Sequence, residues 1–173
     1  MAEQQMSPLE AAKRIASGEK AAAVLGITDE QVKAFAALAY NQYQQGKYDD
    51  AETLFRGVTS LDSNAFYGYA GLGAIALARK PADLNAAYDN LSKAAELKPD
   101  DATIQANLGE VLLRQGKVSD ARMHLEKSFQ SDPDHKDPGV NRVRALVAGL
   151  GILIQEAEKR AKQQGKPTLA QAS

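Results

Sequence analysis

Residues 106–133 read ANLGEVLLRQGKVSDARMHLEKSFQSDP, and this stretch decides the fold. Its landmarks are Asn107-Leu108-Gly109 before a turn signal at Gln115-Gly116-Lys117, and Ala121, Leu125 and Pro133 after it. Apolar residues recur at helical spacing on both sides of Gly116, and glycine is the residue type that most often ends a helix. The stretch therefore predicts two antiparallel helices joined by a short turn.

Two earlier stretches carry the same landmarks. Gly46 and Ala51 mark the turn and the second helix of one copy, and Gly73 and Ala87 lie in the two helices of the other. The first-helix landmarks of these copies are 34 residues apart, and so are Ala87 and Ala121, which is the period of the tetratricopeptide repeat. Ala51 and Ala87 are instead 36 residues apart, so two additional residues are expected in the turn at residues 79–83.

These repeats predict an all-α fold, a tetratricopeptide-repeat solenoid of three helical hairpins. Residues 1–31 are assigned to an N-terminal tail and helix, and residues 137–173 to a C-terminal capping helix and tail. Residues 32–136 hold the repeats, at 32–65, 66–101 and 102–135. A solenoid of helix pairs leaves one concave face open, and binding of another chain is expected there.

Capping residues predict where the flanking helices begin. Ser7 and Pro8, followed by Glu10, predict a first helix that runs to about Gly26. Thr28 and Gln31 form a second capping box, at the start of the first repeat.

The capping helix is expected to begin at Asp137-Pro138 and to lay one apolar stripe on the third repeat. That stripe consists of Val140, Val143, Leu146, Val147, Leu150, Leu153 and Ile154. Residues 156–162 are charged and are expected to extend into solvent. Gly165-Lys166-Pro167 is expected to end the helix before a short disordered tail.

Composition excludes several functional classes. The chain has 21 Lys and Arg against 22 Asp and Glu, without the basic excess typical of nucleic-acid binding. It has no Cys, which excludes disulfides, thiolate metal sites and a cysteine nucleophile. The longest apolar run, residues 145–154, is half of the roughly 20 residues that a membrane-spanning helix needs. Direct membrane insertion is therefore not expected.

The first helix of each repeat is expected to line the concave groove. In the first repeat, Phe35, Leu38 and Ala39 are assigned to contacts with the partner helix, and the opposite stripe of the same helix is assigned to the groove. The predicted peptide-binding residues, at equivalent positions of the three repeats, are Ala36, Tyr40, Tyr43, Tyr67, Ala70, Ala74, Leu77, Ala106, Glu110 and Leu113.

Small alanines flanked by tyrosine and leucine favour pockets for aliphatic or prolyl side chains, and tyrosine hydroxyls can bond a bound backbone. An extended peptide with spaced apolar residues would suit such a surface. Two alternatives stay open: Tyr40, Tyr43 and Tyr67 are ordinary helix packing, or the chain's own first helix occupies the groove.

Two stretches, LGITDE (residues 25–30) just before the first repeat and LAYNQYQQGKYDDA (residues 38–51) within it, resemble the class II chaperones of bacterial type III secretion, which bind translocator proteins before export. The resemblance continues through Leu61-Asp62 and residues 71–74 and covers roughly residues 10–135. Tyr40 and Tyr43 match aromatic positions of this family, and Tyr69-Ala70 matches an apolar pair.

The resemblance implies a cytoplasmic, non-enzymatic chaperone without a cofactor, which holds an extended translocator segment in its groove. Members of the family are commonly homodimers through the N-terminal part. Pro81 in the second-repeat turn and the sequence of the final helix depart from the family pattern.

Other functions are weighed on the same residues. A general repeat adaptor that scaffolds a bacterial envelope, secretion or motility complex is the alternative. Adaptors that grip the carboxylate tail of heat-shock chaperones place Lys and Asn where this chain has Ala36, Tyr40 and Thr103. His124 and His135 are the only histidines and lack metal-ligand spacing, so neither a metal site nor an enzyme is expected.

Overall fold

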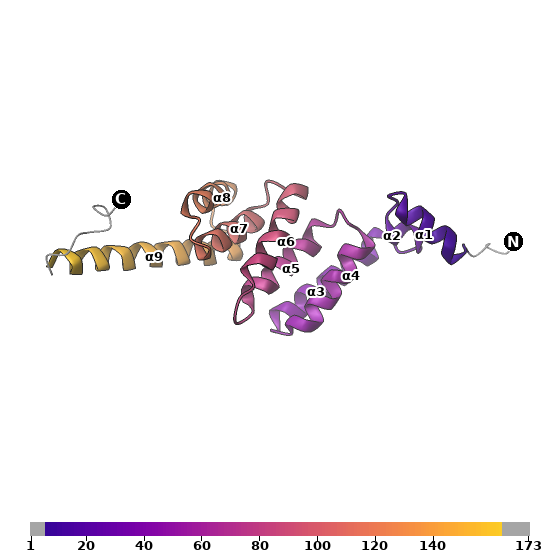
Figure 1. Cartoon of the computed structure of the whole chain (residues 1–173), viewed down its shortest axis with the longest axis horizontal. Helices are drawn as coiled ribbons and strands as arrows, with labels where there is room; N and C mark the ends of the chain where they lie inside the picture. Colours follow the sequence, from indigo (N-terminus) through magenta and orange to yellow (C-terminus); the bar gives the residue numbers. More distant parts are fainter. Residues whose placement is uncertain (1–5, 164–173) are drawn as a thin grey trace.

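The computed structural model describes residues 6–163, which form nine α-helices and no strand. The helices are α1 (Pro8–Ala16), α2 (Ala21–Val24), α3 (Asp29–Gln44), α4 (Tyr48–Leu61), α5 (Phe66–Ala78), α6 (Leu84–Leu97), α7 (Ala102–Arg114), α8 (Val118–Ser131) and α9 (Pro138–Gln163). Figure 1 shows α3 to α8 as a central body, with α1 and α2 at one end and the long α9 projecting from the other. The predicted all-α fold is confirmed.

Three helix pairs, α3–α4, α5–α6 and α7–α8, form the repeats. Gly46 and Gly116 adopt φ values of 75° and 77° in the first and third turns, a conformation that glycine tolerates without strain. Residues 45–47 and 115–117 make these turns, whereas residues 79–83 connect α5 to α6. The two additional residues predicted from the 36-residue interval are thus confirmed in the second turn.

Each pair is held together by close contact between its helices. Ala39, Ala51, Ala87 and Ala121 are fully buried where the helices meet. At Gly73, an added Cβ would lie 2.5 Å from Cγ of Leu91, a distance that no real side chain tolerates. Gly109 has the same relation to Leu125 in the third repeat. The small residues therefore set the separation of the two helices.

The predicted packing face of α3 needs a correction. Phe35 and Leu38 were expected to contact the partner helix, but their side chains are 41% and 49% exposed. The buried face contains Val32 and Ala39, with Ala36 and Tyr43 partly buried beside them. These four residues follow the four-three-four spacing of one helix face, which is rotated away from Phe35 and Leu38.

The N-terminal segment also differs from the prediction, because it forms two short helices. The chain leaves α1 at Gly18, whose φ of 97° is incompatible with a continuing helix. Ala22 then packs with Val32 and Val58, and Lys20 Nζ bonds Asp62 at 2.8 Å. The predicted caps at Ser7 and Thr28 are confirmed by their bonds to the amides of Glu10 and Gln31.

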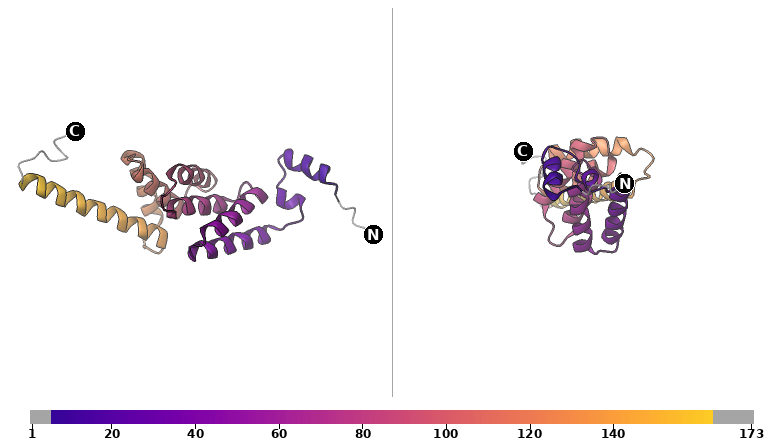
Figure 2. Two further views of the ribbon diagram at one scale, coloured as in Figure 1. Left: turned by 60° about the horizontal axis from the view of Figure 1, so that its bottom comes forward. Right: turned by 90° about the vertical axis from the view of Figure 1, so that its right-hand side faces the viewer.

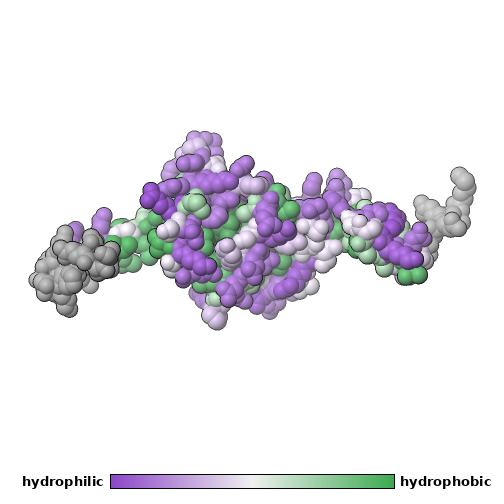
Figure 3. Space-filling model, turned by 45° about the horizontal axis from the view of Figure 1, so that its top comes forward, coloured by the Kyte–Doolittle hydropathy of each residue, from purple (hydrophilic) through white to green (hydrophobic). Residues whose placement is uncertain are grey.

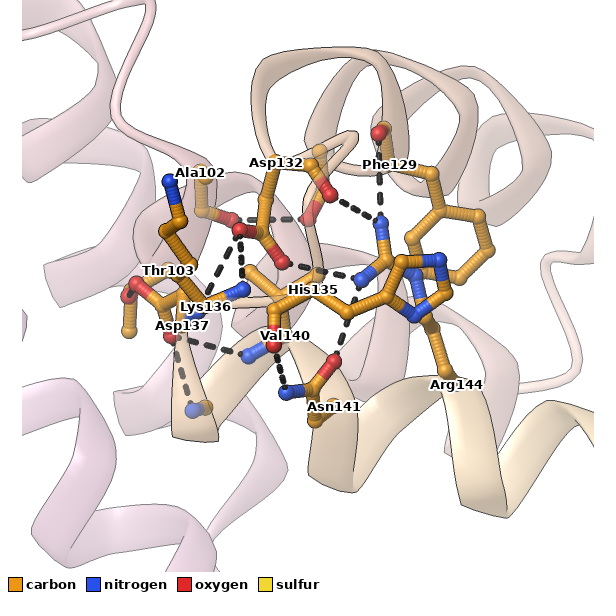
Figure 4. A network of polar contacts seen from close by, with 12 residues as sticks. Ala102, Thr103, Phe129, Asp132, His135, Lys136, Asp137, Val140, Asn141 and Arg144 are labelled. Atoms are coloured by element: carbon orange, nitrogen blue, oxygen red, sulfur yellow. Dashed lines mark hydrogen bonds and ion pairs between the residues drawn. The ribbon is translucent and has the colours of Figure 1, made fainter.

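A polar network holds the start of α9 against the third repeat (Figure 4). Asp132 accepts hydrogen bonds from the amides of Lys136 and Asp137, and its other oxygen lies 2.8 Å from Nη1 of Arg144. Asp137 caps α9 as predicted, because it accepts from the amides of Gly139 and Val140. These five bonds fix the direction in which α9 leaves the repeats.

Only the first part of α9 packs on the solenoid. Val140 and Val143 are fully buried beside Leu125, as predicted. Leu150, Leu153 and Ile154 are exposed, with Leu153 at 63%, so the prediction that the whole stripe contacts the third repeat is wrong. The left view in Figure 2 shows the reason, since α9 continues straight past the repeats. The predicted stop at residues 165–167 and the tail lie outside the described residues.

Gly73→Ala should destabilise the protein by about 1–2 kcal/mol, because the overpacking against Leu91 exceeds the gain in helix propensity. The control is Gly57→Ala in α4, where an added Cβ meets nothing within 4 Å and the propensity gain should raise the melting temperature. Thermal unfolding monitored by circular dichroism measures both. Shifts of the same sign would contradict the packing argument.

Asp132→Asn should destabilise the protein at neutral pH and not at acidic pH. Burial opposes ionisation of Asp132, but the Lys136 and Asp137 amides and the Arg144 guanidinium together hold its pKa below the usual range. The stabilisation is therefore present above the unfolded-state pKa of about 3.9 and is lost as pH falls through the lower folded-state value. Melting temperatures between pH 7 and pH 2 test this, and a difference independent of pH would refute it.

Candidate peptide-binding groove

The inner helices α3, α5 and α7 lie side by side and line a groove with two hollows. The hollows have volumes of about 450 and 410 Å³, and Asn107 lines both. The two hollows follow one another along the inner helices. Tyr40 and Ala70 line the first hollow, and Tyr43 and Ala74, one turn farther along α3 and α5, line the second. The groove therefore changes character along the length of the inner helices.

The first hollow, here called the apolar pocket, lies between tyrosines of two repeats. It is lined by Ala36, Ala37, Tyr40, Phe55, Phe66, Tyr67, Ala70, Gly71, Asp101, Thr103, Ile104 and Asn107. Tyr40 is 55% exposed, and the rings of Phe66 and Tyr67 pack edge to face at 5.4 Å. Gly71 leaves room for the Phe55 ring, which an added Cβ would strike. The space-filling view in Figure 3 shows hydrophobic residues in the central body, bordered by hydrophilic ones.

The second hollow, here called the cationic pocket, is bounded by charged residues of three elements. It is lined by Tyr43, Ala74, Leu77, Ala78, Arg79, Lys80, Pro81, Ala82, Asn107, Glu110, Arg114 and Arg142. Arg142 belongs to α9, so the capping helix supplies part of the wall. Four of these residues are Arg or Lys and one is Glu, which gives the pocket a positive charge.

Glu110 is buried on α7, with its side chain only 1% exposed. Its two carboxylate oxygens pair with Arg114 on the same helix and with Arg142 on α9. Nη2 of Arg142 also donates to Oδ1 of Asn107 at 2.9 Å. A buried carboxylate is stable only when it is paired and hydrogen-bonded, and here the pairing also joins α9 to the groove.

The tyrosines of the groove are hydrogen-bond donors. Burial raises the pKa of the Tyr43 hydroxyl, although the nearby positive charge of Arg142 acts in the opposite direction. Burial and the carboxylates of Asp62 and Asp29 raise the pKa of Tyr67. Both hydroxyls therefore remain protonated at neutral pH and can donate to the backbone of a bound chain.

Eight of the ten predicted groove residues line the two pockets. Ala36, Tyr40, Tyr67 and Ala70 lie in the apolar pocket, and Tyr43, Ala74, Leu77 and Glu110 in the cationic pocket. The other two need a correction: Ala106 is fully buried and Leu113 partly buried, and both pack in a cluster with Val140 and Val143. The reason is that α9 covers this end of the groove.

Two alternatives for the groove can now be examined. Packing alone does not account for Tyr40, because more than half of its surface is exposed. The chain's own first helix, α1, contacts α2, and α2 contacts α4, so the described part of the N-terminal segment lies outside the groove (Figure 1).

Sequence reasoning missed several lining residues. Phe55 reaches the apolar pocket from α4, and Arg142 reaches the cationic pocket from α9. Phe66 immediately precedes the predicted Tyr67 and could have been found by extending the stripe to the start of α5. No local signal marks Arg142, because its role depends on where α9 docks.

Within residues 6–163, no helix is both long enough and apolar enough to cross a membrane. Nor do three or more His, Asp or Glu residues of that range gather in a way that could hold a metal ion. His124 Nδ1 instead lies 2.6 Å from the Gln105 side chain, and burial lowers the pKa of that imidazole.

Glu110→Gln should destabilise the protein by about 1–3 kcal/mol, because it removes the charge from two buried ion pairs. The control is Glu126→Gln, which removes an exposed pair with Arg122 at the same i, i+4 spacing and should cost at most about 0.5 kcal/mol. Urea unfolding curves measure both. Equal losses would show that the buried pairs contribute nothing beyond an exposed one.

Known protein families and sequences match this architecture. One tetratricopeptide-repeat family model matches residues 76–148, and another tetratricopeptide-repeat model matches residues 30–59. The low calcium response locus protein H of Yersinia pseudotuberculosis is 30% identical over 129 residues, which cover 73% of this chain and 75% of that protein.

Solved structures agree with the sequence relatives. The type III secretion translocator chaperone SycD of Yersinia enterocolitica is similar with a TM-score of 0.62 and 25% identity, over 76% of this chain and 98% of SycD. SycD in complex with a peptide of the translocator YopD is similar in fold with a TM-score of 0.58 and 24% identity, over 70% of this chain and 90% of that one. The chain belongs to the family of low calcium response locus protein H, the tetratricopeptide-repeat translocator chaperones of type III secretion.

Proposed function

We propose that this protein is a cytoplasmic, non-enzymatic chaperone that binds an extended segment of a translocator in its groove and keeps the translocator soluble before type III export. The observation that carries this proposal is the open apolar pocket between Tyr40 and Tyr67. The YopD peptide bound to SycD supports it, because SycD has the same fold.

The apolar pocket is suited to side chains that would otherwise aggregate. Tyr40, Phe66 and Tyr67 provide aromatic walls, while Ala36 and Ala70 leave space between them. Each methylene that a client buries there contributes about 0.8 kcal/mol. The client backbone, in an extended conformation, can accept hydrogen bonds from the protonated tyrosine hydroxyls.

Binding alone would perform this function. A translocator contains segments that enter membranes, and in water such segments associate with one another. Covering an apolar anchor segment would keep the translocator separate from its partners without a covalent step, a nucleotide or another cofactor.

The N-terminal segment supplies a surface for a second copy of the chain. Leu9, Ile15 and Leu25 are exposed on and after α1 and α2, away from the groove. Dimerisation through this segment would cover these side chains and leave the groove accessible. The relative SycD also forms dimers, one of which is described as an alternative dimer.

Tyr40→Glu combined with Tyr67→Glu should abolish client binding, because each substitution places a charge against the apolar pocket. The client is the product of a neighbouring gene with long apolar segments, co-expressed with the chaperone and recovered by affinity purification. The control is Tyr88→Glu on α6, an exposed tyrosine that lies outside both pockets.

The double variant should remain helical by circular dichroism while it no longer retains the client in the soluble fraction. Tyr88→Glu should behave like the parent in both measurements. Retention of the client by the double variant would exclude the groove as the binding site. Failure of every such neighbour to bind the parent would favour the adaptor alternative.

A further inference from the structure

The cationic pocket carries positive charge that the protein itself does not neutralise. Glu110 balances one of its two partners, Arg114 and Arg142, so this cluster keeps one positive charge. Arg79 is balanced separately by Asp49 and Glu52. Lys80 is exposed and makes no ion pair with any described residue, which adds a second positive charge.

We infer that the groove selects a client segment in which an apolar anchor is accompanied by an aspartate or glutamate, whose carboxylate enters the cationic pocket. The inference rests on the proposed function and specifies the chemistry of its client. The proposed function does not require an acidic client, because a neutral segment could fill the apolar pocket and would leave the ion pairs of Glu110 unchanged.

The guanidinium groups are positioned to receive a carboxylate. Glu110 and Asn107 hold Arg142 in place, and Glu110 also holds Arg114. Their side chains are nevertheless about half exposed, and both line the pocket. A guanidinium that is already oriented loses little conformational freedom when it binds a carboxylate, and its fork geometry matches the two oxygens.

The spacing of anchor and acid follows from the geometry of α7. Thr103 and Asn107 line the apolar pocket, and Glu110 and Arg114 lie seven positions farther along the helix from each of them. Seven residues of helix span about 10 Å. An extended chain advances about 3.3 Å per residue and repeats a face every second residue. The acid should therefore lie two or four residues from the anchor.

The experiment uses the full-length chaperone and a synthetic peptide. The peptide reproduces the segment of the co-expressed client that the chaperone protects from proteolysis. Each Asp or Glu in it is replaced in turn by Asn or Gln, and dissociation constants are measured by fluorescence anisotropy at low and high salt. The chaperone variants are Lys80→Glu and Arg114→Gln, with Lys93→Glu on the outer face of α6 as the control for charge reversal.

Neutralising the acid nearest the anchor should weaken binding to the parent roughly tenfold and reduce its salt dependence. Lys80→Glu should weaken binding of the original peptide by a similar factor, but have a smaller effect on the neutralised peptide. Lys93→Glu should leave both affinities unchanged. The Lys80 side chain makes no hydrogen bond or ion pair within the described structure, so its substitution should leave the fold intact. It therefore tests the pocket even if Arg114→Gln fails to fold.

Equal affinities for the original peptide and every neutralised peptide would overturn the inference. A protected segment without any Asp or Glu two or four residues from an apolar anchor would also overturn it. In either case, loss of binding in the Tyr40→Glu and Tyr67→Glu variant would leave the proposed function standing. Full binding by that variant would instead reject the groove itself.

Discussion

The packing of the whole solenoid depends on the close approach of paired helices, which requires glycine, with no side chain, at two of the positions where the helices meet. Gly73 against Leu91 and Gly109 against Leu125 bring the first helices of the second and third repeats so close to their partners that even a methyl group would collide. This separation, repeated with alanines at the neighbouring contacts, sets how one hairpin stacks on the next. The groove is the concave side of that stack, so its shape follows from residues that lie outside it.

Features encoded by neighbouring residues could be predicted from the sequence. Caps at Ser7, Thr28 and Asp137 involve bonds over two or three residues, and the additional residues of the second turn appear directly in the interval between Ala51 and Ala87. Eight groove positions were also found, because equivalent positions of a repeat face the same way. In each case periodicity or local hydrogen bonding carries the information.

Features that depend on how distant elements dock could not be predicted in this way. Phe35 and Leu38 have the same chemistry as core residues, and only the position of α4 and α5 decides that the adjacent face is buried. Ala106 and Leu113 occupy the same repeat positions as groove residues of the first two repeats. They are nevertheless covered by α9, because the third repeat packs against the capping helix. A terminal repeat has one neighbour that is not a repeat, and equivalence fails there.

Arg142 gives the capping helix a role beyond closing the solenoid. The same guanidinium attaches α9 to Glu110 and forms a wall of the cationic pocket. Occupancy of the pocket and attachment of α9 are consequently linked equilibria, and the linkage is reciprocal: a ligand held by Arg142 strengthens the docking of α9 by as much as docking strengthens the ligand. Displacement of α9 from α7 would thus remove Arg142 from the wall of the cationic pocket and lower the affinity of that pocket for a ligand that Arg142 contacts.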